Sequence, residues 1–325
     1  METPRSEEQL VIKRLDECTF RQAVELWNVG FSGYYSDMTT TLESFVPRLG
    51  RLSIRPELSV AAYLNGEPAG FVLIALKTVN GAKVAWNGGT GVNPAFRGRG
   101  IAKTLMREAA EILKAERVPK ALLEVVQKNT GAIKAYESAC FRIADGLIGA
   151  RRDGSLPDDR SLLQPSETDD AGMVRANVAS IRPERPPEYR AVPAKPYEIG
   201  KLPFYREAAW TSQWYNLSDG EGLIVLDGEG NPAAYALLRK RTKEDGTIDS
   251  ITVYQCEADP SREDSGELQR WTLSAAFGPA ELACKRTTDN LSMSNPETVK
   301  WLEEAGFETV YTQYLMIADF SGGQP

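Results

Sequence analysis

Histidine is absent from this chain of 325 residues. Its absence removes the commonest transition-metal ligand and the commonest general base, so acid and base chemistry must use Asp, Glu, Tyr, Lys, Cys or water. The four cysteines are widely scattered and form no C-x-x-C pair, which fits free thiols in a reducing compartment. We therefore expect no metal site.

The chain also lacks a long apolar run and an excess of positive charge. Its longest apolar run, Ala69 to Leu76, is far shorter than the ~20 residues needed to span a bilayer. Residues 1–8 hold no apolar signal segment, so we expect a cytoplasmic protein with no membrane partner. The formal net charge of −7 gives no support for nucleic-acid binding and mildly favours cationic small molecules.

The length predicts two domains, because a single domain typically holds about 100 to 200 residues. We place the boundary in the charged, turn-rich segment 151–166, which gives domains 1–153 and 154–325. Strand and helix patterns alternate through the first half, which indicates a mixed sheet with helices on its faces. The expected elements include a hairpin turning at 65–68, a strand at 83–92, a helix at 101–116, a strand at 121–126 and a helix at 129–139.

The second half repeats landmarks of the first half at an offset of 166 positions. Three landmark residues keep their order and no gap falls between them, so duplication explains them better than chance. The pairs are Pro94 and Pro260, Asn129 and Asn295, and Phe141 and Phe307.

A loop with two glycines joins the strand at 83–92 to the helix that begins at Ile101. Residues 97–102 of this loop read Arg-Gly-Arg-Gly-Ile-Ala. Glycines let several backbone N–H groups point one way, and a helix start adds its own N–H groups and its positive dipole end. Two arginines stand beside them. The loop therefore predicts a cradle for the phosphates of a cofactor.

The same run, Val92 to Ala102, fits the Q/R-x-x-G-x-G/A signature of the GNAT superfamily of acyl-CoA-dependent N-acyltransferases, which the chain resembles. A second motif follows: Asn129, Ala132, Tyr136 and Phe141 fit that family's N-x-x-A-x-x-x-Y-x-x-x-x-F helix pattern. Both motifs in this order are far more specific than the loop alone. The resemblance implies an α/β (α+β) fold of two tandem domains, each a mixed, mostly antiparallel sheet with a splayed central strand pair and flanking helices.

By this resemblance the donor is acetyl-CoA. The loop amides would hold its pyrophosphate, the strand end at Gly91 and Val92 would pair with the pantetheine arm, and Tyr136 would act as acid to the departing thiolate. The implied acetyl-CoA-binding residues are Gly91, Val92, Arg97, Gly98, Arg99, Gly100, Ile101, Ala102, Asn129 and Tyr136.

The general base of the family does not carry over to this chain. Many members place a glutamate on the strand before the loop, where Trp86 and Asn87 stand here. We name Glu124, on the neighbouring strand, as the fallback base, with a water chain or an amine that arrives deprotonated as equal alternatives. The acceptor pocket is expected along the connector 31–40, with Asp37 as a candidate to hold an ammonium group. The acceptor candidates are Tyr34, Tyr35, Asp37 and Asn87.

Each candidate also has a plainer structural explanation. Tyr136 at helical spacing is by default a core aromatic, Asn129 an N-cap, and Glu124 a solvated or paired strand residue. Tyr34 and Tyr35 are as well explained as packing residues.

The second copy lacks the motif residues that would bind phosphate and supply the acid. At the 166 offset, Glu263 and Asp264 replace the arginine and glycine that open the loop, and Leu302 replaces Tyr136. Carboxylates repel a pyrophosphate, so we expect no CoA binding of the usual kind in residues 154–325. This degenerate copy would close the acceptor site, fix the domain pair or make a homodimer.

The sequence thus predicts an N-acetyltransferase (a transferase of the acyltransferase class) that carries an acetyl group from acetyl-CoA to a primary amine of a small molecule or peptide by direct attack. Residues 1–153 would be the catalytic domain. The alternative is a non-catalytic acyl-CoA-binding or sensing protein, which the missing glutamate favours. The retained Tyr136 argues for catalysis, because a sensor needs no acid at the sulfur.

Overall fold

The computed structural model describes residues 9–157 and 189–321. Contacts divide the chain into two compact units, residues 1–144 with 316–325, and residues 145–315. Residues 158–166 of the turn-rich segment in which we placed a boundary lie outside the described residues. The cut between 153 and 154 stays a prediction. Within the described ranges, no helix is both long and apolar enough to cross a membrane.

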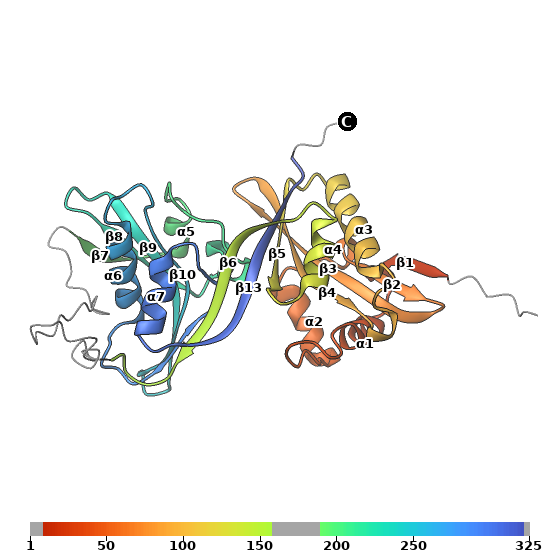
Figure 1. The fold of residues 1–325 in the computed structure, drawn as a ribbon, viewed down its shortest axis with the longest axis horizontal. Coiled ribbons are helices and arrows are strands. Elements are labelled where there is room, and N and C mark those ends of the chain that lie inside the picture. The colour runs from red at the N-terminus through yellow and green to blue at the C-terminus, as the bar shows by residue number, and fades with distance from the viewer. Residues whose placement is uncertain (1–8, 158–188, 322–325) are drawn as a thin grey trace, which may run out of the picture. The chain divides into compact units, whose positions relative to one another are not determined.

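The first unit is a mixed, mostly antiparallel sheet with helices against it (Figure 1). Strands β1 to β4 are successive antiparallel neighbours, and β5 joins β4 in parallel. The expected elements are confirmed, and the four predicted by range end within two residues of the observed bounds. The elements are β1 (Leu10–Arg14), α1 (Phe20–Gly30), α2 (Leu42–Arg51), β2 (Val60–Leu64), β3 (Glu67–Val79), β4 (Ala82–Val92), α3 (Ile101–Ala115), β5 (Lys120–Val126), α4 (Thr130–Glu137) and the start of β6 (Arg142–Arg152).

Strand β3 is buried along most of its length because helices cover both of its faces. Phe71 points towards α1, where its ring stacks on that of Trp27 with centroids 5.6 Å apart. The neighbouring Gly70 points the other way and lies against Leu105 of α3. This packing fixes α1 and α3 on opposite sides of the sheet.

Strands β4 and β5 separate shortly after they pair. Their parallel register runs only from Val84 with Lys120 to Trp86 with Leu122. Beyond this point β4 carries a bulge: Asn87 and Gly89 face consecutive residues of β3, so Gly88 is an extra residue. A bulge bends a strand and increases its local twist. The splayed strand pair is therefore present, and it opens the sheet beside the end of β4.

Helix α1 comes very close to the end of β4. A Cβ atom on Gly91 would lie 3.0 Å from the Cα atom of Gly30, which is tighter than ordinary packing. The contact requires glycine on both sides. It sets the loop that follows α1 next to the opening between β4 and β5.

The described part of the second unit repeats most of the element order of the first, without a counterpart of α2 and with the additional short strand β12. Strands β4 and β10 begin and end 166 residues apart, and the same offset relates Asn129 and Asn295, the N-caps of α4 and α7. The elements are β7 (Arg190–Ala194), α5 (Pro196–Ile199), β8 (Glu221–Leu226), β9 (Pro232–Thr242), β10 (Ile248–Ala258), α6 (Ser265–Phe277), β11 (Lys285–Thr288), β12 (Leu291–Ser292), α7 (Pro296–Glu304) and β13 (Glu308–Asp319).

The final strands of the two repeats, β6 and β13, each contribute residues to both units. In the second unit, Arg152 of β6 is the register partner of Arg286 in β11. In the first unit, the backbone N–H of Phe320, just after β13, donates to the carbonyl oxygen of Pro119 at 2.7 Å. Each repeat therefore contributes part of its last strand to the other compact unit, namely residues 145–152 of β6 and residues 316–319 of β13.

Candidate active site

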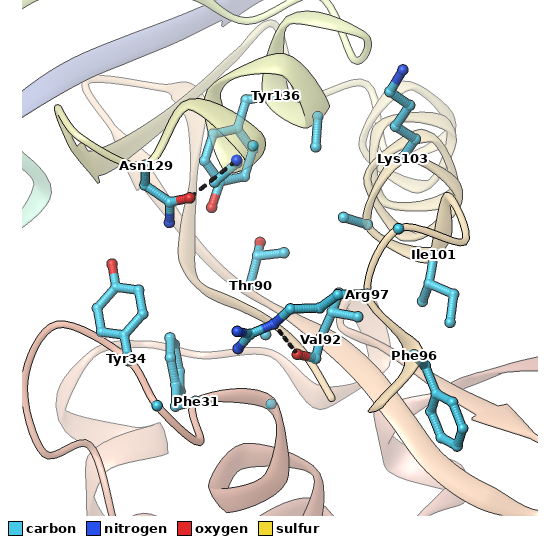
Figure 2. Close-up of a pocket in the computed structure, with 18 of the residues that line it drawn as sticks. Phe31, Tyr34, Thr90, Val92, Phe96, Arg97, Ile101, Lys103, Asn129 and Tyr136 are labelled. Carbon is cyan, nitrogen blue, oxygen red and sulfur yellow. Dashed lines mark hydrogen bonds between the residues drawn. The ribbon is translucent and has the colours of Figure 1, made fainter. Parts of the chain in front are cut away.

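A cavity of about 660 Å³ lies in the first unit beside the separated end of β4 (Figure 2). Its volume is in the range of small-molecule sites. Four segments form its walls: the loop after α1, the end of β4, the glycine loop with the start of α3, and α4. The lining residues include Phe31, Tyr34, Tyr35, Thr90, Gly91, Val92, Arg97, Gly98, Gly100, Ile101, Ala102, Lys103, Asn129 and Tyr136.

The glycine loop has the geometry of an anion cradle. Gly98 and Gly100 both have φ near +80°, which an L side chain rarely adopts, and a Cβ atom on either would meet nothing within 4 Å. Gly100 is the N-cap of α3 and offers no side chain to the first turn. The first backbone N–H groups of a helix have no partner within the helix. Residues 101–103 therefore present N–H groups and a positive dipole end at the cavity wall.

The two arginines of the loop have different surroundings. Arg97 lines the cavity, where its Nε donates to the carbonyl oxygen of Val92 at 3.2 Å and its Nη2 to that of Ser32 at 3.1 Å (Figure 2). Arg99 instead lies over the ring of Phe96, 5.6 Å from its centroid. Arg97 therefore connects the end of β4 to the loop after α1, whereas Arg99 is not among the residues that line the cavity.

Tyr136 enters the cavity from α4, and only 6% of its surface is exposed. Burial raises the pKa of its phenol to about 12, against the opposing effect of a hydrogen bond with Thr90. The group therefore stays protonated at neutral pH. Because a thiol of the cysteine type has a pKa of about 8.5, a phenol of this pKa is better suited to donate a hydrogen bond to a thiolate than to protonate it fully.

Asn129 fixes both the start of α4 and the opposite wall. Its side-chain oxygen accepts the backbone N–H of Ala132 at 3.2 Å, as an N-cap does. Tyr34 also lines the cavity; burial raises the pKa of its phenol, and the nearby Asn129 side chain opposes that rise. Tyr35, which is 58% exposed, stands at the rim with its ring 5.1 Å from that of Tyr34. The Asn129 side chain thus caps α4, and the same residue forms part of the cavity wall.

Four residues predicted for the site do not line the cavity: Asp37, Asn87, Arg99 and Glu124. Asp37 is exposed, and its hydrogen bonds with Thr39 lower its pKa. Glu124 accepts a hydrogen bond from Nε1 of Trp86 at 2.6 Å. Their proposed roles stay predictions.

Asn87 is buried, with 5% of its surface exposed, and its Nδ2 donates to Oγ1 of Thr90 at 2.8 Å. Sequence reasoning missed Thr90 and Lys103 as lining residues, whereas Phe31 belongs to the connector 31–40 that was expected at the acceptor pocket. For Thr90 a signal was available, because it lies two residues before Val92 and alternate strand residues share a face.

A metal centre has no support from the side chains in residues 9–157 and 189–321, where no three Cys, Asp or Glu residues gather at one point.

Comparison with known proteins agrees with this geometry. Residues 20–140 match the model of the acetyltransferase (GNAT) family. An acetyltransferase of Pectobacterium atrosepticum is 32% identical over 102 residues, which are 31% of this chain and 70% of that protein.

Two solved structures share the fold over 97% of this chain. One is a GCN5-related N-acetyltransferase from Sphaerobacter thermophilus, with 12% identity, a TM-score of 0.56 and 97% of that chain covered. The other is the GCN5-related glucosamine N-acetyltransferase region of a fungal multi-domain GH3 β-N-acetylglucosaminidase, with 13% identity, a TM-score of 0.55 and 39% of that chain covered. At these identities the two structures establish the fold alone.

Proposed function

This chain belongs to the GNAT family of acetyltransferases, and on that premise we propose that it transfers an acetyl group from acetyl-CoA to a primary amine of a small molecule or peptide. One observation carries the proposal. The glycine loop, the separated end of β4 and the phenol of Tyr136 all line the same cavity, and that cavity has room for a small-molecule ligand.

The donor fits the cavity walls. Its phosphates would lie against the backbone N–H groups of residues 98–102, with the cationic side chains of Arg97 and Lys103 beside them. Its pantetheine arm would follow β4 at Gly91 and Val92. Nε of Arg97 now donates to the carbonyl oxygen of Val92. When the pantetheine arm lies along β4, the Arg97 guanidinium would leave this oxygen and turn towards the glycine loop.

The reaction requires no covalent enzyme intermediate. The amine nitrogen attacks the thioester carbonyl carbon, a C–N bond forms, and the C–S bond breaks as the tetrahedral intermediate collapses. One proton leaves the nitrogen and one reaches the sulfur, so the products are an amide and the CoA thiol. Tyr136 would donate its hydrogen bond to the sulfur as negative charge develops there. Holding two substrates together supplies much of the rate.

One observation favours the second candidate, a non-catalytic acyl-CoA-binding or sensing protein. Among the described residues that line the cavity, none is Asp or Glu, so no carboxylate stands ready to take the proton of the amine. For the enzyme, this leaves an amine that arrives deprotonated or a water chain as the route.

A binding and turnover experiment separates the two functions. Calorimetry measures the affinity for CoA, and release of the CoA thiol from acetyl-CoA is followed over a panel of amines. We expect binding together with turnover on at least one amine. Tight binding without turnover on any amine would assign the protein to the sensors.

We further propose that the second unit binds no CoA. At the start of α6, Asp264 occupies the position of Gly98, and its Oδ2 accepts a hydrogen bond from the buried Tyr189 at 2.5 Å. Arg262 donates to the same Tyr189 hydroxyl at 2.6 Å. The carboxylate of Asp264, with Tyr189 and Arg262 bound to one another beside it, would thus occupy the place of a phosphate at the start of α6. Calorimetry should give one CoA per chain, and two would refute this assignment.

A further inference from the structure

Thr90 lies next to Tyr136 at the centre of the cavity wall. It stands on β4 between Gly89 and Gly91 and lines the cavity, and Figure 2 shows its side chain between the end of β4 and the Tyr136 ring. Both residues line the same cavity (Figure 2), and the Thr90 hydroxyl lies close enough to the Tyr136 phenol to oppose the rise of its pKa. Neither the family motifs nor the sequence pattern assigns it a role.

A buried amide holds the hydroxyl of Thr90 in place. Nδ2 of Asn87 lies 2.8 Å from Thr90 Oγ1, and the Thr90 hydroxyl reaches Asn87 Oδ1 at 3.2 Å. Asn87 is itself fixed, because its Oδ1 accepts the N–H of Gly89 at 3.1 Å. The β-branch of threonine already restricts its first side-chain torsion. The rotamer of Thr90 is therefore strongly determined.

The bulge at Gly88 makes this pair possible. Side chains three residues apart on a regular strand point to opposite faces. The extra residue at Gly88 shifts that alternation by one, which brings Asn87 and Thr90 to the same face. One irregularity thus supports the splayed strand and builds a hydrogen-bonded pair beside Tyr136.

We propose that Thr90 is a positioning residue for Tyr136 and that Asn87 holds Thr90 for this purpose. The inference rests on the proposed role of Tyr136 as the acid. A threonine hydroxyl has one donor and two acceptor sites. Before the reaction it accepts from the phenol while its own proton points to Asn87 Oδ1, and that proton turns to the phenol oxygen when the phenol proton moves towards the sulfur. No atom is gained or lost by Thr90.

The electrostatic surroundings of Tyr136 support this role. Burial raises the pKa of the phenol to about 12, and the hydrogen bond with Thr90 opposes that rise, whereas the neighbouring Tyr34 adds to it. A donor to the phenol oxygen stabilises the developing phenolate. Thr90 thus makes Tyr136 a stronger hydrogen-bond donor than its burial alone would allow.

The test compares Thr90→Val, which keeps the shape and removes the hydroxyl, with Thr90→Ser, which keeps the hydroxyl. We follow thiol release from acetyl-CoA with the best amine of the panel. Thr90→Val should lower kcat about tenfold with KM for acetyl-CoA unchanged, because the variant loses a hydrogen bond to a group that gains charge in the reaction. Thr90→Ser should restore most of kcat.

A double-mutant cycle with Tyr136→Phe separates positioning from a structural role. In the Tyr136→Phe background, Thr90→Val should cause no further loss of kcat. An equal loss in both backgrounds would overturn the proposal. If Tyr136→Phe alone keeps full turnover, the acid role itself fails, which is a different outcome.

A spectroscopic measurement needs no turnover. With 3-fluorotyrosine at position 136, the ¹⁹F shift reports the pKa of the phenol directly. Thr90→Val should raise this pKa and Thr90→Ser should not. An unchanged pKa in Thr90→Val would show that the hydroxyl does not act on the phenol.

Discussion

Nε1 of Trp86 lies 2.6 Å from Oε2 of Glu124, next to the last register pair of β4 and β5. The indole N–H thus occupies one carboxylate oxygen at the point where the strands begin to separate. Many family members would have a glutamate where Trp86 and Asn87 stand. Here the carboxylate that contacts Trp86 is on the other strand and already has a hydrogen-bond donor.

This contact leads to a prediction for Glu124. Because it does not line the cavity, Glu124→Gln should keep kcat within about twofold and leave the acidic limb of the pH–rate profile in place. Trp86→Phe, which removes the indole donor, is the matched variant. If Glu124→Gln instead lowers kcat 100-fold or more and the acidic limb of the pH–rate profile disappears, Glu124 is the base.

Tyr136→Phe should lower kcat roughly 100-fold, the lower range for general acid catalysis, with little change in the Kd for CoA. Steady-state kinetics and calorimetry provide the two measurements. Tyr197→Phe, at an exposed position of α5 that does not line the cavity, is the control for removing a phenol hydroxyl. Equal kcat in Tyr136→Phe and the unmodified protein would exclude the acid role.

The pKa of Tyr136 also predicts a pH dependence. The neutral phenol is the donor, and its pKa is raised to about 12, so its protonated fraction falls only as the pH approaches that value. Turnover should therefore show no loss from this group up to about pH 10. A basic limb below pH 9 that disappears in Tyr136→Phe would contradict the raised pKa.

Arg97 and Arg99 offer a matched pair for the donor site. Arg97→Glu should weaken CoA binding about tenfold or more, because a cation that lines the cavity is replaced by an anion facing phosphates. Arg99→Glu makes the same charge change outside the lining and should weaken binding less. Calorimetry at two salt concentrations checks both, with thermal unfolding to show that the variants fold. Equal effects would mean that only the net charge of the loop matters.

Glu257 in the second unit should make stability depend on pH. Its pKa is raised to about 7, mainly by burial, while Arg206 lowers it and Asp145 raises it. The pKa of Glu257 is higher in the folded state than in the unfolded state. Its contribution to the free energy of unfolding is therefore complete below about pH 4.5 and is lost as the pH rises through 7. The free energy of unfolding should differ by roughly 3 kcal/mol between the two ends of this range.

Glu257→Gln should remove this pH dependence. Compared with the unmodified protein, the variant should therefore do better at pH 8 than it does at pH 5. Urea unfolding at both pH values measures it, with Glu263→Gln as the exposed control. A variant whose stability falls with pH as steeply as that of the unmodified protein would refute the assignment.

Local patterns in the sequence predicted much of the fold. The order of strand, glycine loop, helix, strand and helix follows from apolar periodicity, and Asn129 was expected as a cap because of its place before a helix. The fold class is confirmed. These features depend on residues close together in the chain, where spacing and turn chemistry are informative.

The rest depends on relationships that spacing does not contain. Arg97 and Arg99 look alike in the loop, yet only Arg97 reaches the cavity. A regular strand would place Asn87 and Thr90 on opposite faces, and the single extra residue at Gly88 reverses this. No periodicity reveals that β6 pairs with β11, because the register of distant segments is set by three-dimensional packing.

The exchange of final strands has a practical consequence for anyone who would dissect this protein. A gene fragment ending at residue 153 would lack residues 316–321, which belong to the same compact unit as the cavity. A fragment starting at residue 154 would lack residues 145–152, which belong to the other unit. Neither half of the sequence thus contains a complete compact unit, and a cut between residues 153 and 154 takes residues away from both units.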